Sequence, residues 1–175
     1  MSDRFIQSVQ NFVANRFGSG SSRNMGPPGL VKCVREFFRH MDLAAVSRAG
    51  RSGYPRRLDR LTRQLCRRMP GDGPKWGPAR KFLNLFLRDA VYDYQLRRAY
   101  RLRELEKVLE LPLDSHVGHR LREEEEGRHL PRWHSVKHLT PEESAEFQAV
   151  AARVAKRKRI YRIHLDLSYW RGPAR

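Results

Sequence analysis

Apolar residues recur every three or four positions along most of this chain, which is the spacing of helices with one buried face. Ser2 is a suitable N-cap for a first helix that carries such a face, and a second helix is expected from Leu30 to Met41. Residues 160–170 fit both a strand and a helix. Because no second strand is visible in the sequence, we interpret them as a helix. The pattern therefore predicts an all-α fold.

Capping residues and prolines place the remaining helices. Pro55 suits the first turn of one helix, and the next is expected from about Pro78 to Gln95. A charged helix is predicted from Arg97 to Leu111 and is ended by a proline. Asp114 would cap the helix that follows, and Thr140 opens the capping-box sequence TPEE of another.

The length of 175 residues suits one domain, so we treat 1–175 as a single compact helical unit. Within it, residues 18–29 read GSGSSRNMGPPG and are interpreted as a flexible linker. The helix expected at 78–95 is apolar around most of its circumference, which indicates a central position in the domain.

The chain carries 36 Lys and Arg against 19 Asp and Glu, a formal net charge of +17. Such a field attracts polyanions, so double-stranded DNA is the expected partner. An anionic membrane surface is the rival partner, but no segment approaches the roughly 20 apolar residues of a spanning helix, and the N-terminus lacks the layout of a signal peptide. We expect a cytoplasmic monomer without membrane association.

The sequence offers no set of metal ligands. Cys33 and Cys66 stand far apart, and the spacing of His129, His134 and His138 fits no standard metal motif. We therefore expect neither a metal nor a cofactor.

Eight arginines and a single acid, Asp59, lie between residues 48 and 68. At 100° per residue the leucines of this segment share one face, and four arginines lie opposite them: Arg56, Arg60, Arg63 and Arg67. Few acids stand where they could pair with these cations along the helix. Contact with phosphates is the favoured interpretation, and a solvated helix face is the alternative.

Polar residues form one stripe on the otherwise apolar helix at 78–95, namely Lys81, Asn84, Arg88 and Tyr92. Burying a polar stripe without partners is costly, so it should face a cleft or a polar partner. Alternatively, Lys81 extends its amine to solvent at the start of its helix. Asp114 can act as a helix cap and still serve chemistry, because backbone N–H groups keep a carboxylate ionised and oriented.

The segment RKFLNLFL at 80–87, followed by LDSHV at 113–117, resembles the core of the helix-hairpin-helix base-excision DNA glycosylases. In that family a Pro-Gly-x-Gly hairpin binds a phosphate through backbone amides, a lysine of the next helix is catalytic in bifunctional members, and an aspartate is the catalytic carboxylate. The resemblance implies a helix-hairpin-helix element here, with Lys81 and Asp114 as the catalytic residues. It covers about residues 69–121.

The register of the hairpin stays open, since either Pro70–Gly73 or Trp76–Ala79 could form it. The segment between the lysine and the aspartate is also longer than is usual in the family. The resemblance and the arginine face together predict these DNA-binding residues: Gly71, Gly73, Lys75, Gly77, Arg80, Arg56, Arg60, Arg63 and Arg67. The expected base pocket comprises Trp76, Asn84, Arg88, Tyr92 and Trp133, and Trp170 is a further candidate for stacking on the base.

The expected function is that of a DNA N-glycosylase that flips and excises a modified base, with strand scission if Lys81 forms a Schiff base. That base could be a lesion or a hypermodified phage base, which would make the protein an antiviral enzyme. The alternative is a non-catalytic helical protein that binds DNA or RNA, in which the arginines and the hairpin are the whole function. This alternative gives Asp114 no functional role.

Overall fold

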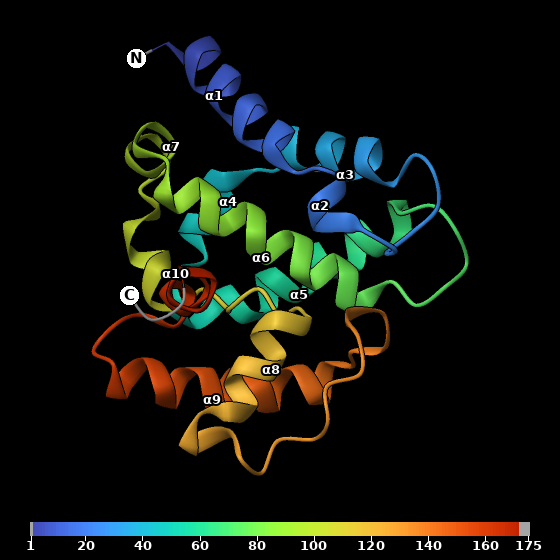
Figure 1. Ribbon diagram of the computed structural model, residues 1–175. Helices are drawn as coiled ribbons and strands as arrows, with labels where there is room; N and C mark the ends of the chain where they lie inside the picture. The colour runs from blue at the N-terminus through green and yellow to red at the C-terminus, as the bar shows by residue number, and fades with distance from the viewer. Residues whose placement is uncertain (1, 172–175) are drawn as a thin grey trace.

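The computed structural model describes residues 2–171, and every regular element in that range is a helix (Figure 1). The all-α prediction is confirmed. The α-helices are α1 (Asp3–Arg16), α2 (Ser19–Ser22), α3 (Leu30–Arg39), α4 (Leu43–Arg48), α5 (Gly50–Arg68), α6 (Trp76–Tyr92), α7 (Tyr94–Ala99), α8 (Ser115–Glu123), α9 (Pro141–Arg157) and α10 (Leu165–Arg171). The short 3₁₀ helices are η1 (Leu102–Lys107), η2 (Glu125–Gly127), η3 (Val136–His138) and η4 (Arg162–His164).

The three predicted N-caps are confirmed. The hydroxyl of Ser2 accepts a hydrogen bond from an N–H of α1, and Asp114 Oδ1 accepts one from the N–H of Val117 at 2.9 Å. Thr140 and Glu143 form the complete capping box of α9. These side chains satisfy N–H groups that have no partner within their own helix.

The predicted charged helix from Arg97 to Leu111 is wrong. The chain leaves helical geometry at Arg101, which has a φ of 54°, and continues as η1. Leu96, Leu102 and Leu105 are all buried, yet an unbroken helix would direct Leu96 away from the other two. The break allows all three to reach the same core.

Other boundaries also differ from the predictions. Helix α5 begins at Gly50, directly after α4, so Pro55 lies inside the helix with its ring exposed. Helix α6 begins at Trp76, which moves Lys81 from the first turn into the second. The segment expected to be a flexible linker contains α2. Of residues 160–170, those from 162 onward are helical, as η4 and most of α10.

The described residues form two hydrophobic clusters, and α6, which runs through the middle of the molecule (Figure 1), contributes its buried apolar residues to the first. The first cluster comes mainly from α1, α3, α5, α6 and η1, and the second from the chain after residue 110. Leu109 belongs to the first cluster and Leu111 to the second. The segment between them therefore carries the chain from one core to the other.

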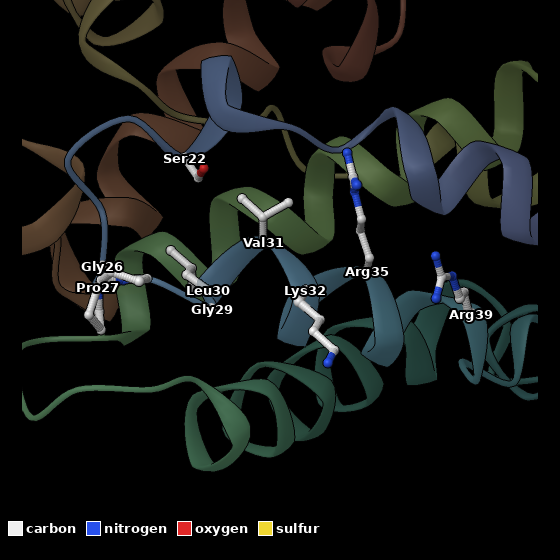
Figure 2. Close-up of a pocket in the computed structure, with 10 residues that line it drawn as sticks. Ser22, Gly26, Pro27, Gly29, Leu30, Val31, Lys32, Arg35 and Arg39 are labelled. Carbon is white, nitrogen blue, oxygen red and sulfur yellow. The ribbon is translucent and has the colours of Figure 1, made fainter.

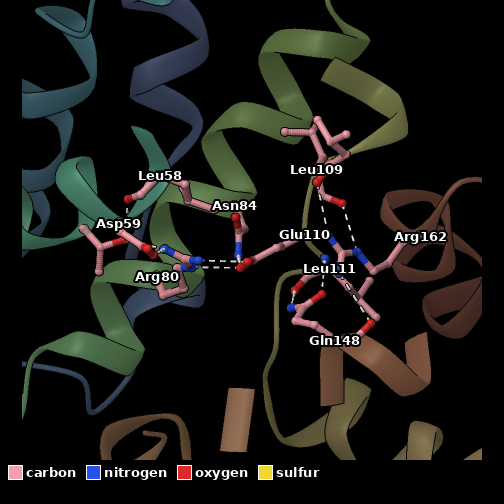
Figure 3. Close-up of polar contacts among 11 residues, drawn as sticks. Leu58, Asp59, Arg80, Asn84, Leu109, Glu110, Leu111, Gln148 and Arg162 are labelled. Atoms are coloured by element: carbon pink, nitrogen blue, oxygen red, sulfur yellow. Dashed lines mark hydrogen bonds and ion pairs between the residues drawn. The ribbon is translucent and has the colours of Figure 1, made fainter. Parts of the chain in front are cut away.

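Glu110 lies at this crossing and binds Arg80 of α6 (Figure 3). The Arg80 guanidinium donates to both carboxylate oxygens of Glu110 at 2.8 Å, and to Asp59 Oδ1 at 2.7 Å and Thr62 Oγ1 at 3.1 Å. Burial alone would raise the pKa of Glu110, but the bonds and charge of Arg80 hold it below its ordinary value. A planar, bidentate pair of this kind fixes both position and orientation.

The backbone on both sides of Glu110 is also bonded to side chains (Figure 3). Arg162 donates to the carbonyl oxygens of Val108 at 3.1 Å and Leu109 at 3.2 Å. The amide of Gln148 bonds both the N–H of Leu111, at 3.0 Å, and its carbonyl oxygen, at 2.7 Å. The segment that leads to Asp114 is therefore held from α6, α9 and η4.

We expect Glu110→Ala to lower the free energy of unfolding by about 3–5 kcal/mol, because it leaves a buried guanidinium without its main partner. Equilibrium urea unfolding measures this change. Glu104→Ala is the matched control, since Glu104 pairs with Arg51 and Lys107 on the surface and should change stability little. Equal losses in the two variants would contradict the structural role of the pair.

Candidate active site

A cavity of about 510 Å³ opens beside α6, between α2 and α10. Its wall carries Arg16, Ser21, Lys81, Tyr92, Asp114 and Asp166. These residues come from five elements or the loops next to them, so the site exists only when the two hydrophobic clusters are packed together.

Lys81 lies in the wall of this cavity with 7% of its surface exposed. Its Nζ atom is 3.8 Å from Asp114 Oδ2 and donates to the carbonyl oxygen of Ser21 at 3.3 Å. Burial lowers the pKa of Lys81, although the negative charges of Asp114 and Asp166 oppose the shift. The structure thus brings together the two residues that the sequence predicted as catalytic, and places the amine where little water can reach it.

The two carboxylate oxygens of Asp114 have different partners. Oδ1 caps α8 by accepting from the N–H of Val117, and Oδ2 is directed toward Lys81. The side chain is 20% exposed, so a molecule in the cavity can reach it. The cap holds the carboxylate in one orientation, and the predicted structural and chemical roles are compatible in this geometry.

Asp166 is a second acid of the cavity, more deeply buried than Asp114, and the sequence analysis missed it. Its carboxylate binds Nη1 of Arg88, whose other nitrogens donate to Asp89 Oδ1 at 2.8 and 2.9 Å. Burial raises the pKa of Asp166, and the charge of Arg88 opposes the shift. The feature of the sequence that could have indicated Asp166 is its position as a lone acid between two apolar residues, Leu165 and Leu167.

Two aromatic residues named in the sequence analysis line the cavity, Tyr92 and Trp170. The Tyr92 hydroxyl lies 2.7 Å from Nδ1 of His164, and Nε2 of that ring lies 3.2 Å from Glu106 Oε1. Trp170 is largely exposed, and its ring lies 4.7 Å from the ring of His116. The cavity therefore has an apolar surface on which a planar group could stack.

The structure does not bring Asn84, Trp133 or Trp76 to the cavity. Asn84 is turned into the protein and donates to Glu110 at 3.2 Å. Trp133 lies in the second hydrophobic cluster and donates to Ser115 at 3.2 Å, while Trp76 packs beside that cluster. Of the expected base-pocket residues, only Arg88 and Tyr92 line the cavity.

The segment 69–75, which joins α5 to α6, contains Gly71, Gly73 and Lys75. Gly71 has a φ of +83°, a conformation that favours glycine. Trp76–Ala79, the other candidate hairpin, is instead the first turn of α6. A Cβ at Gly77 would lie 1.9 Å from the carbonyl oxygen of Val136, so Gly77 allows close packing against η3.

The predicted DNA-binding arginines fall into two groups. Arg80 is buried and bonded to Glu110 and Asp59, which makes it a structural cation. The four arginines of the α5 face are exposed and have no ion pair within residues 2–171: Arg56, Arg60, Arg63 and Arg67. Because the leucines opposite them pack toward α6, this arginine face points away from the cavity.

A second cavity, of about 650 Å³, lies over the first turns of α3 (Figure 2). Its arginines already have partners, since Arg35 donates to the carbonyl oxygen of Phe17 and Arg39 bonds Asn15 and Glu36. The rest of its wall is mostly glycine, proline and aliphatic side chains, with Ser22 and Lys32 as the other polar residues and no acid among them.

Within residues 2–171 no three His, Cys, Asp or Glu side chains gather as metal ligands. No helix in that range is both long enough and apolar enough to cross a membrane. Comparison with models of protein families, with curated proteins and with solved structures finds no match to this chain.

We expect Asp114→Asn to lower the pKa of Lys81 further, because the carboxylate that favours the ammonium is removed. Titration of the Lys81 side chain by NMR, with ¹³C- and ¹⁵N-labelled lysine, measures this change. Glu104→Gln is the control, since this surface acid does not line the cavity. An unchanged Lys81 titration in Asp114→Asn would show that the two groups do not interact.

Proposed function

We propose that this protein is a DNA N-glycosylase that excises a modified base and then cleaves the strand through a Schiff base on Lys81. The observation that carries the proposal is the pair formed by Lys81 and Asp114, 3.8 Å apart on the wall of an open cavity. An amine with lowered pKa beside a carboxylate is the arrangement needed for nucleophilic attack on a sugar carbon.

The two residues have separate tasks in this reaction. As the bond between C1′ and the base breaks, its electron pair leaves with the base and positive charge develops on the sugar, which an ionised Asp114 stabilises. The Lys81 amine bonds C1′ and gives up a proton, which the Asp114 carboxylate, 3.8 Å away, can accept. Opening of the sugar ring forms the Schiff base, and loss of a C2′ proton then expels the 3′ phosphate.

The charge distribution supports DNA as the substrate. A net charge of +17 attracts duplex DNA at long range. Arg16 is exposed at the cavity and has no ion pair within residues 2–171, so it is the nearest free cation for the phosphates beside an extruded nucleotide. The arginine face of α5 lies on another surface and adds to the general attraction.

We expect a duplex that contains one natural abasic site to be trapped covalently on the wild-type protein by borohydride. Lys81→Gln should abolish the adduct, and Asp114→Asn should lower excision of a modified base by about 10²–10³-fold. Denaturing gel electrophoresis measures both products.

Lys75→Gln is the matched control for trapping, because the Lys75 amine bonds the carbonyl oxygen of Met69 and does not line the cavity. Trapping that persists in Lys81→Gln would exclude Lys81 as the nucleophile. Salt-sensitive DNA binding without trapping or excision by the wild type would indicate the alternative function, a non-catalytic nucleic-acid-binding protein.

We expect Arg60→Ala and Arg63→Ala each to flatten the dependence of log Kd on log salt concentration by about 0.9 for every phosphate that is no longer neutralised. The reason is that fewer counterions are released when fewer cations meet the backbone. Fluorescence anisotropy with a labelled duplex at several salt concentrations measures the slope. Arg157→Ala is the control, since Arg157 is already paired with Glu124 and Glu126. Slopes that match the wild type would exclude the arginine face from DNA binding.

A further inference from the structure

One wall of the cavity is a short segment that carries no apolar side chain. It comprises residues 18–24, GSGSSRN, and we call it the lid. Phe17, directly before the lid, is buried, and its ring centre lies 4.7 Å from that of Phe82 in α6. Met25, directly after the lid, packs against both hydrophobic clusters. The lid is therefore fixed at its two ends, while its own residues add no apolar side chain to the core.

A single hydrogen bond joins the lid to another helix. Lys81 Nζ, in α6, donates to the carbonyl oxygen of Ser21 at 3.3 Å, and no other hydrogen bond or ion pair connects the described lid residues to a different helix. The hydroxyl of Ser22 and the N–H of Ser21 both donate to the carbonyl oxygen of Gly18, inside the lid. A segment with so few bonds to its surroundings opens at a low cost in free energy.

The opposite side of the cavity, around Lys81, is held more firmly. Arg80, next to Lys81, binds Glu110 on the segment that leads to Asp114, so α6 and that segment keep their relative positions. Lys81 is only 7% exposed, and an amine must come within bonding distance of a sugar carbon to attack it. Compared with this side, the lid is the part of the wall that can move to let a substrate reach the amine.

We propose that the lid closes over Lys81 in the free protein and must swing away before the amine can react. This inference rests on the proposed function and adds a gating step to it. Each end of the lid has a residue suited to a hinge, since Gly18 has no side chain and Asn24 has a φ of 58°, in a region that Asn tolerates. The bond from Lys81 to Ser21 is then an autoinhibitory contact, because the nucleophile itself holds the lid closed.

Trypsin cleavage after Arg23, the exposed arginine of the lid, measures how often the lid opens. Lys81→Met removes the bond to Ser21 and should raise the rate of this cleavage about 3- to 30-fold, the effect of losing one hydrogen bond. Mass spectrometry of the digest identifies the cut. Cleavage after Arg128, in the exposed loop before η3, should keep its rate and serves as the internal reference.

Lys107→Met is the matched control, because Lys107 bonds Glu104 on the surface, outside the lid. It should leave the cleavage after Arg23 unchanged. An unchanged rate in Lys81→Met would overturn the inference, because Lys81 would then not restrain the lid. A rise equal to that after Arg128 would also overturn it, because the variant would then have lost stability throughout the protein.

Gly18→Ser tests whether the lid controls the amine. Gly18 is the N-cap of α2 without a side-chain bond, so a serine hydroxyl there would cap this helix. A Cβ at Gly18 lies 3.8 Å from the carbonyl oxygen of Arg16, so the side chain fits the closed lid, and Gly18 does not line the cavity. The variant should slow both cleavage after Arg23 and borohydride trapping on an abasic site by the same factor, about 2- to 5-fold. A time course with saturating protein measures the trapping.

Gly53→Ser is the control for this variant, since Gly53 lies in α5 and a Cβ there has an ordinary contact distance of 3.5 Å. It should change neither rate. Unchanged cleavage or unchanged trapping in Gly18→Ser would overturn the inference alone. Absence of trapping by the wild type would overturn the proposed function and the gating with it, whereas the cleavage rates need no DNA and still show whether Lys81 holds the lid.

Discussion

The buried ion pair between Arg80 and Glu110 is the interaction on which the rest of this structure depends. It joins the central helix α6 to the segment that crosses between the two hydrophobic clusters. Neither cluster alone would fix how the crossing segment lies against α6, because apolar packing is not directional. The bidentate pair is directional, and the bonds from Arg162 and Gln148 hold the neighbouring backbone in the same register.

The candidate active site follows from the way the crossing segment is placed against α6. Lys81 follows Arg80 on α6, and Asp114 lies four residues after Glu110 on the crossing segment. Binding of Arg80 to Glu110 therefore brings Lys81 within 3.8 Å of Asp114. Arg80 and Glu110 form short hydrogen bonds with each other and with neighbouring groups, whereas the distance between Lys81 and Asp114 is longer and this second pair faces a cavity. A structural ion pair thus positions a second, looser pair whose groups remain available to a substrate.

The charges of the protein are divided between surface and cavity. The exposed arginine face of α5 has no acids bonded to it within residues 2–171, while Lys81 and Arg88 face Asp89, Asp114 and Asp166 around the cavity. A phosphate is repelled by such acids, but a developing sugar cation is stabilised by them. The proposed function requires this division, with cations on the surface for the DNA backbone and acids in the cavity for the sugar of one nucleotide.

The sequence by itself determined the elements that depend on local chemistry. Helical periodicity predicted the all-α fold, and Ser2, Asp114 and Thr140 cap helices as expected, because a cap bonds N–H groups only a few residues away. The sequence also singled out Lys81 and Asp114 as a pair, through a resemblance rather than through geometry. Tertiary structure decided the rest. It buried Arg80 and Asn84 against Glu110 and placed Trp133 in the second core. It also broke the predicted charged helix at Arg101. Finally, it brought Asp166 to the cavity and His164 to Tyr92 from the far end of the chain. Those outcomes depend on contacts between segments that are distant along the chain, and periodicity carries no information about which distant residue will meet which helix face.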